Sequence, residues 1–192
     1  MDNKIQGKVL YMLMNHFSLR GDSSENRQYL QKTVYLLVAT GVKIGYGFSW
    51  WKYGPCSSTL IEDAHIVELN RDEFEEMSKD SYFSECSISH FDEFEEIVGD
   101  TLHDLDHLEL FASTLFLINV WDYNTQKKIL EGFKKHKRVL FSGNKFTQEQ
   151  ILSSFRKCKK LKAMVKEWEE ESAAKQKEQE RIDKIKNRMY NI

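Results

Sequence analysis

The scarcity of helix breakers constrains this chain more than any other feature of its sequence. The 192 residues contain nine glycines and a single proline, Pro55. Because these two residue types interrupt helices most strongly, we expect helices to dominate the fold. Apolar residues at spacings of three and four predict helices over about residues 3–18, 22–40, 57–69, 72–79, 91–105, 107–121, 125–136 and 147–192. The helix over residues 107–121 is the most apolar, so we expect it to be the central one. Asp22 with Glu25 and Thr147 with Gln150 predict capping boxes, and residues 81–89 are predicted to form a loop.

One segment departs from this helical pattern. Residues 42–53 alternate aromatic and small or polar side chains, with Tyr46, Phe48 and Trp50 at every second position. Alternation of this kind predicts one or two short strands, and the following Gly54-Pro55 predicts a turn. The sequence therefore favours a mainly α fold, a compact helical domain with a small two- or three-stranded β element and an extended C-terminal helix.

The same alternation divides the aromatic side chains between two faces. If Phe48 and Trp50 face the core, Trp51 and Tyr53 face the other way. Exposed rings on a strand could contact a partner or stack on nucleic-acid bases, and the alternative is core packing beneath the charged helices.

The last part of the chain changes character. Positions 169–181 offer no apolar stripe, and a narrow stripe resumes only at Ile182, Ile185 and Met189. We therefore predict a domain at residues 1–165 and a charged C-terminal helical extension at residues 166–192. The resumed stripe makes self-association through this helix a further hypothesis.

Two features bear on the compartment. No apolar run approaches the roughly 18 residues that a membrane-spanning helix needs, and the amphipathic N-terminus lacks a small-residue cleavage site. Cys56, Cys86 and Cys158 are odd in number and far apart, which fits reduced thiols. We expect a cytoplasmic protein without a membrane partner.

Charge is distributed very unevenly along the chain. Residues 61–110 carry 17 acidic and 2 basic side chains, whereas residues 127–166 carry 13 basic and 2 acidic ones. The formal net charge of −2 excludes a uniformly basic nucleic-acid wrapper. The two segments could fold against each other, form solvated faces, or, for the basic segment, bind nucleic acid. The candidate nucleic-acid contacts are Lys134, Lys135, Lys137, Arg138, Arg156, Lys157, Lys159 and Lys160.

The sequence offers little catalytic chemistry. It has no phosphate-binding glycine loop and no nucleophile elbow, and nothing places a histidine beside Cys56. His103 and His107 have the i, i+4 spacing of a zinc-binding helix, with Cys86 or His90 as a conceivable third ligand. However, the pair falls at an expected helix–helix junction, so we favour polar boundary residues over the alternative of a metal-dependent enzyme. We predict no catalytic residue, metal or cofactor.

Three segments resemble the YwgA-like and SocA/Panacea superfamily. They are Leu30-Gln31-Lys32-Thr33-Val34-Tyr35-Leu36-Leu37, the run from Phe48 to Leu60 that contains Tyr53-Gly54-Pro55-Cys56-Ser57, and Leu108-Glu109-Leu110-Phe111-Ala112-Ser113. Weaker similarity around Lys137, Phe141 and residues 147–151 extends the resemblance over roughly residues 5–162. The acidic region and the C-terminal tail fall outside the pattern, and Cys56 stands where the family often has an aromatic residue.

This resemblance implies a non-enzymatic activity. Members of the superfamily are similar to antitoxins and to proteins of prophage and defence loci, so it implies a prokaryotic or phage protein that binds a toxin or a defence-system subunit. We place the candidate partner contacts at Trp51, Tyr53, Lys32, Tyr35, Ser57 and Ser58. Lys32 and Tyr35 could equally meet the segment after Tyr53 and hold the strand-to-helix connection.

Overall fold

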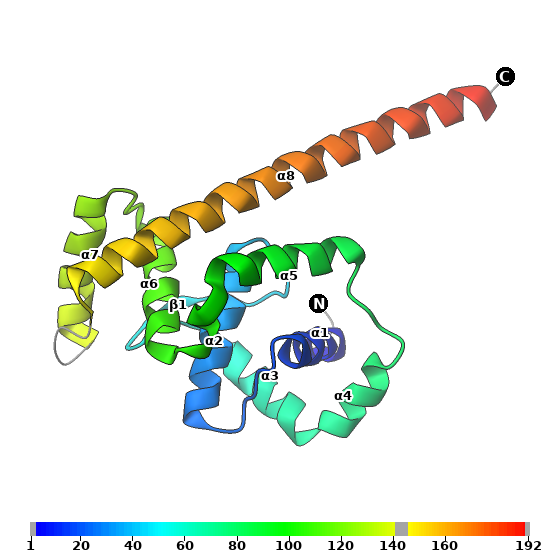
Figure 1. Cartoon of the computed structure of the whole chain (residues 1–192). Helices are drawn as coiled ribbons and strands as arrows, with labels where there is room; N and C mark the ends of the chain where they lie inside the picture. Colours follow the sequence, from blue (N-terminus) through cyan, green and yellow to red (C-terminus); the bar gives the residue numbers. More distant parts are fainter. Residues whose placement is uncertain (1–2, 141–145, 191–192) are drawn as a thin grey trace.

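The structure is a computed structural model that describes residues 3–140 and 146–190, with the side chains of residues 3, 100, 137–140 and 185–190 excepted (Figure 1). Within these residues the fold is mainly helical, as predicted. The helices are α1 (Asn3–His16), α2 (Ser24–Ala39), α3 (Ser58–Leu69), α4 (Arg71–Ser78), α5 (Glu85–Val98), the 3-10 helix η1 (Gly99–His103), α6 (Leu105–Trp121), α7 (Gln126–Leu140) and α8 (Gln148–Tyr190). Strands β1 (Ser49–Trp51) and β2 (Gly54–Cys56) form the small antiparallel sheet.

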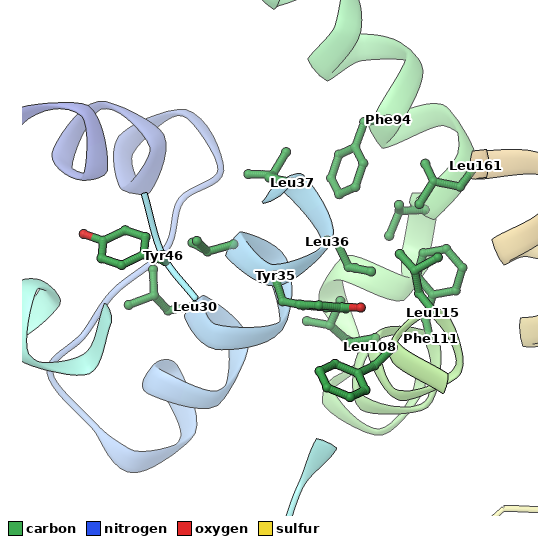
Figure 2. Close-up of a cluster of buried hydrophobic side chains, with 14 of the residues drawn as sticks. Leu30, Tyr35, Leu36, Leu37, Tyr46, Phe94, Leu108, Phe111, Leu115 and Leu161 are labelled. Carbon is green, nitrogen blue, oxygen red and sulfur yellow. The ribbon is translucent and has the colours of Figure 1, made fainter. Parts of the chain in front are cut away.

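Helix α6 lies at the centre of the core. Every residue from 108 to 118 is buried, and the helix packs against α2, α7, α8 and β2. Figure 2 shows side chains of α2 and α6 in one cluster with Phe94 of α5 and Leu161 of α8. The prediction that the most apolar helix is the central one is confirmed, because only a helix surrounded by partners can bury apolar side chains on all sides.

Side-chain caps define where most helices begin. The predicted Thr147 capping box is confirmed: the Gln150 N–H donates to Thr147 Oγ1 at 3.2 Å and the Thr147 N–H donates to Gln150 Oε1 at 2.8 Å. The box predicted at Asp22 is wrong by one residue, since Ser23 accepts the Asn26 N–H. The loop predicted at residues 81–89 is also wrong in part, because Ser84 caps a helix that begins at Glu85.

The β hairpin turns one residue pair earlier than predicted. Lys52 and Tyr53 form the turn, and Gly54-Pro55 belongs to β2, with Trp50 opposite Pro55 and Trp51 opposite Gly54. The pair next to a two-residue turn exchanges hydrogen bonds and the next pair does not, so the missing N–H of Pro55 costs this ladder nothing.

Helix α8 has a buried half and an exposed half. Up to Trp168 it contributes Phe155, Leu161 and Met164 to the core, whereas residues 169–184 are all exposed and extend away from the domain (Figure 1). The helix has 43 residues, which corresponds to about 65 Å. It continues without a break through the predicted domain boundary at residue 165, and that boundary stays a prediction. Of the predicted self-association stripe, Ile182 is exposed, and the side chains of Ile185 and Met189 lie outside the described residues.

Trp168 is the last buried side chain in the described part of α8. Its ring stacks on His90 with centroids 4.0 Å apart, and its indole N–H donates to Glu93 at 2.8 Å.

We expect truncation after Trp168 to lower the free energy of unfolding by only about 0.5 kcal/mol, because residues 169–184 are exposed. Trp168→Ala in the full chain should cost about 3 kcal/mol. Urea unfolding measures both.

Sedimentation of the truncated and full-length chains completes this test. If Ile182 and its neighbours mediate self-association, the truncated chain should remain monomeric where the full chain associates. A truncation that strongly destabilises the protein and leaves its association unchanged would mean that the tail packs back onto the domain.

Candidate interaction surface

The connection from β2 to α3 is held by two neighbouring side chains of α2. Gln31 bonds both backbone groups of Ser57: its amide N–H donates to the carbonyl at 2.7 Å and its amide oxygen accepts the Ser57 N–H at 2.8 Å. The Lys32 ammonium donates to the Pro55 carbonyl at 2.9 Å. The predicted contact of Lys32 with this connection is confirmed. All these groups are buried, and a buried polar group without a hydrogen-bond partner is costly. The three bonds therefore fix the connection from β2 to α3.

The three motif segments, residues 30–37, 48–60 and 108–113, meet at this connection. Helices α2 and α6 pack on each other, and β2 packs on both. Gly54 has φ +86° and lies directly against Ser113 of α6, whose buried hydroxyl has no hydrogen-bond partner among the described residues. Glu109 and Ala112 are buried on the same helix. The motif residues thus form a buried support for the hairpin, which we call the hairpin base: Gln31, Lys32, Gly54, Ser57 and Ser113.

The six predicted partner contacts fall into two groups. Lys32 and Ser57 are buried in the hairpin base, and Tyr35 is buried against Phe48 with ring centroids 5.2 Å apart. Burial raises the pKa of the Tyr35 hydroxyl well above its usual range. A partner would reach these three only by opening the core. The exposed group consists of Trp51, Tyr53 and Ser58. Partner contact stays a prediction for all six.

The hairpin separates its aromatic side chains as the alternation predicts. Trp50 faces inward, with ring centroids 5.5 Å from Phe116 and 5.2 Å from Trp121. Trp51 on the opposite face is 66% exposed, and Tyr53 in the turn is 39% exposed. Lys52 places its ammonium 5.1 Å from the Tyr53 ring. We call Trp51, Lys52 and Tyr53 the hairpin tip.

Helix α7 closes the aromatic cluster behind the tip. The His136 ring stacks on Trp121 at 4.1 Å and lies 6.1 Å from Trp50. Burial, assisted by the neighbouring Lys135 charge, lowers the pKa of His136 and so favours its neutral form. The cluster therefore supports β1 through ring contacts.

The two candidate zinc-ligand histidines do not share one helix. His103 ends η1 and His107 lies in the first turn of α6, with Asp104 between them as the N-cap, as the predicted junction requires. Asp104 accepts the His107 N–H at 3.0 Å, and this bond lowers the pKa of its carboxyl. Cys86 and His90 lie on α5, where the His90 ring stacks on Trp168. Among the residues that the structure describes, no group of three or more potential ligands has the geometry of a metal site.

The predicted nucleic-acid contacts lie on two packed helices. Lys134 and Lys135 are exposed on α7, and Arg156, Lys159 and Lys160 are exposed on α8. Lys157 is also exposed, and its ammonium donates to the Thr101 hydroxyl at 3.0 Å. The side chains of Lys137 and Arg138 lie outside the described residues.

Sequence patterns did not reveal a cleft of about 600 Å³ beneath α8, lined by α1, α2, α5 and α8. Its lining includes Leu13, Leu37, Phe94 and Trp168. The four elements that line it are distant in sequence, so no local pattern reveals it.

In the described part of the chain, no helix is both long and apolar enough to cross a membrane. Comparison with family models, curated proteins and solved structures gave no match to this chain.

Proposed function

We propose that this protein is a non-enzymatic, cytoplasmic protein-binding component of a prokaryotic or phage toxin–antitoxin or anti-phage defence system. Its partner would be a toxin or a defence-system subunit, which it neutralises or presents to another protein. The order of the three motif segments along the chain supports this proposal through the family resemblance. The exposed hairpin tip supplies the binding surface.

The observation that carries the proposal is an exposed tryptophan on a rigid support. Trp51 exposes two thirds of its surface, while Trp50, its neighbour in β1, is fixed among Phe116 and Trp121. A preorganised aromatic side chain loses little conformational entropy on binding, and tryptophan is enriched among residues that dominate interface energies. The tip is therefore suited to enter a pocket on another protein.

Trp51→Ala should weaken binding to the partner by about 30-fold or more, because a hot-spot residue contributes about 2 kcal/mol or more. The first partner to test is any product of a neighbouring gene that inhibits growth when it is expressed alone. Co-expression of the wild type should relieve that inhibition, and the variant should lose this effect.

Tyr82→Ala is the matched control. Tyr82 is 84% exposed and precedes α5, away from the hairpin in sequence, so its removal changes aromatic content without touching the tip. Both variants should keep the thermal stability of the wild type, since neither ring is buried. Equal loss of binding in both variants, or none in Trp51→Ala, would contradict a contact through the tip.

A further inference from the structure

The outward face of α7 is a row of lysines. Lys127, Lys128, Lys134 and Lys135 are exposed, while Ile129 and Phe133 are buried on the opposite side of the helix. Lys127 and Lys134 are two turns apart, as are Lys128 and Lys135, which corresponds to about 10.5 Å along the axis. Four ammonium groups are therefore displayed over two turns of one helix.

Helix α8 carries further exposed cations. It packs on α7 (Figure 1) and exposes Arg156, Lys159 and Lys160 in its first half. The Lys159 ammonium lies 5.5 Å from the ring centroid of Phe155 on its own helix. We call the seven cations on the two helices the basic face.

Ion pairs between described residues do not neutralise the basic face, although the exposed Glu131 lies between the two lysine pairs of α7. Within the described residues, none of its seven cations forms an ion pair, although cations elsewhere do so, as in Lys79–Glu76 and Lys166–Glu170. No ion pair among these residues joins the acidic helices α4 and α5 to α7 or α8. Of the two interpretations of the charge asymmetry that involve only the protein, the described contacts thus favour solvated faces.

We infer that the basic face binds the phosphate backbone of nucleic acid without sequence preference. This function is additional to the protein contact proposed above and uses different residues. A duplex carries one negative charge per about 1.7 Å of its axis. Lysines about 10 Å apart can therefore each contact a phosphate at any position of the helix along the duplex.

The composition of the face favours nucleic acid over a protein partner. Protein interfaces have an apolar core, and no large exposed hydrophobic side chain lies on the described parts of α7 or on α8 before Ile182. The described exposed side chains of α7 are Gln126, Glu131 and the four lysines. Contacts to phosphates fix position but carry no sequence information, so such a surface should not discriminate between sequences.

Fluorescence anisotropy with a labelled mixed-sequence DNA duplex tests this inference on the full-length chain. If each of the four α7 lysines neutralises one phosphate, affinity should fall about 150-fold between 50 and 200 mM salt. Lys128→Glu with Lys135→Glu should lower affinity more than tenfold at 50 mM salt and reduce the salt dependence. An unrelated duplex of equal length should bind equally well.

The control reverses two lysines on the exposed half of α8. Lys175→Glu with Lys177→Glu changes the net charge equally but lies outside the basic face, and affinity should change less than about threefold. No binding by the wild type at 50 mM salt, or equal losses in the two double variants, would overturn the inference. It would also be overturned if the α7 reversal abolished self-association at low salt and DNA did not bind, because the acidic face of a second copy would then be the ligand.

Discussion

Gly54→Ala should destabilise the protein by about 3 kcal/mol or more. Gly54 has φ +86°, where an L-residue with a side chain is strained by about 1–2 kcal/mol. A methyl group at this position would also overlap the hydroxyl of Ser113, and overpacking in a core costs a further 1–3 kcal/mol, roughly. Urea unfolding followed by circular dichroism measures the change in the free energy of unfolding.

Substitutions at two other glycines distinguish the cost of backbone strain from the cost of the overlap with Ser113. Gly41 has φ +99° and open space around it, so Gly41→Ala should show the conformational cost alone, about 1 kcal/mol. Gly47 has neither constraint, and Gly47→Ala should be nearly neutral.

Ser113→Ala offers a rescue of the overlap. It removes a buried hydroxyl that has no partner and relieves the overlap, so the double variant should recover part of the Gly54→Ala loss. If Gly54→Ala cost no more than Gly41→Ala, the close packing of the hairpin base against α6 would be contradicted.

Gln31→Leu should cost a similar amount, about 3 kcal/mol. The substitution keeps an apolar stem but leaves the buried Ser57 N–H without its partner, and a buried unsatisfied group costs about 1–3 kcal/mol. It also removes the shorter of the two bonds to the Ser57 carbonyl, which keeps only the Ile61 N–H at 3.4 Å. Because Ser57 is also the N-cap of α3, the start of that helix should become less protected against hydrogen exchange.

Gln28→Leu is the matched control one turn earlier on α2. Gln28 makes only one long, exposed bond to Ser24, so its loss should change stability by less than about 0.5 kcal/mol. Comparable effects of the two substitutions would show that the Gln31 bonds contribute nothing specific to the hairpin base.

Local patterns predicted much of this fold. The buried run of α6, the Thr147 capping box and the opposite faces of Trp50 and Trp51 each depend on residues a few positions apart, whose geometry is set by the helix or strand itself. The contact of Lys32 with the segment after Tyr53 was predicted across the chain because the two motifs occur together in the resemblance.

Long-range packing decided what the sequence left open. Pro55 is typical of a turn, and it belongs to a strand here because the register with Trp50 places it at a non-hydrogen-bonded pair. The start of α5 has no apolar stripe, so only its Ser84 cap marks it.

Part of the candidate site was hidden for the same reason. Gln31 and Ser113 belong to the hairpin base, and the only sequence sign of their importance is a polar residue within a buried apolar helix. Alternation predicted only that Trp51 faces away from Trp50, and core packing beneath the charged helices is wrong for it because Trp51 is exposed. Burial of Ser57 depends on α2 and could not be predicted from the local sequence. The unpaired state of the α7 lysines likewise depends on where the acidic helices lie.

The most direct test of the central claim is the affinity of the partner protein for three versions of this chain at 150 mM salt. The wild type, Trp51→Ala and the Lys128→Glu, Lys135→Glu variant can be compared by biolayer interferometry. A contact through the hairpin tip predicts a loss of about 30-fold or more for Trp51→Ala and less than about threefold for the charge variant, since exposed charges affect association rates more than affinity. Unchanged affinity of Trp51→Ala together with a large loss in the charge variant would contradict it.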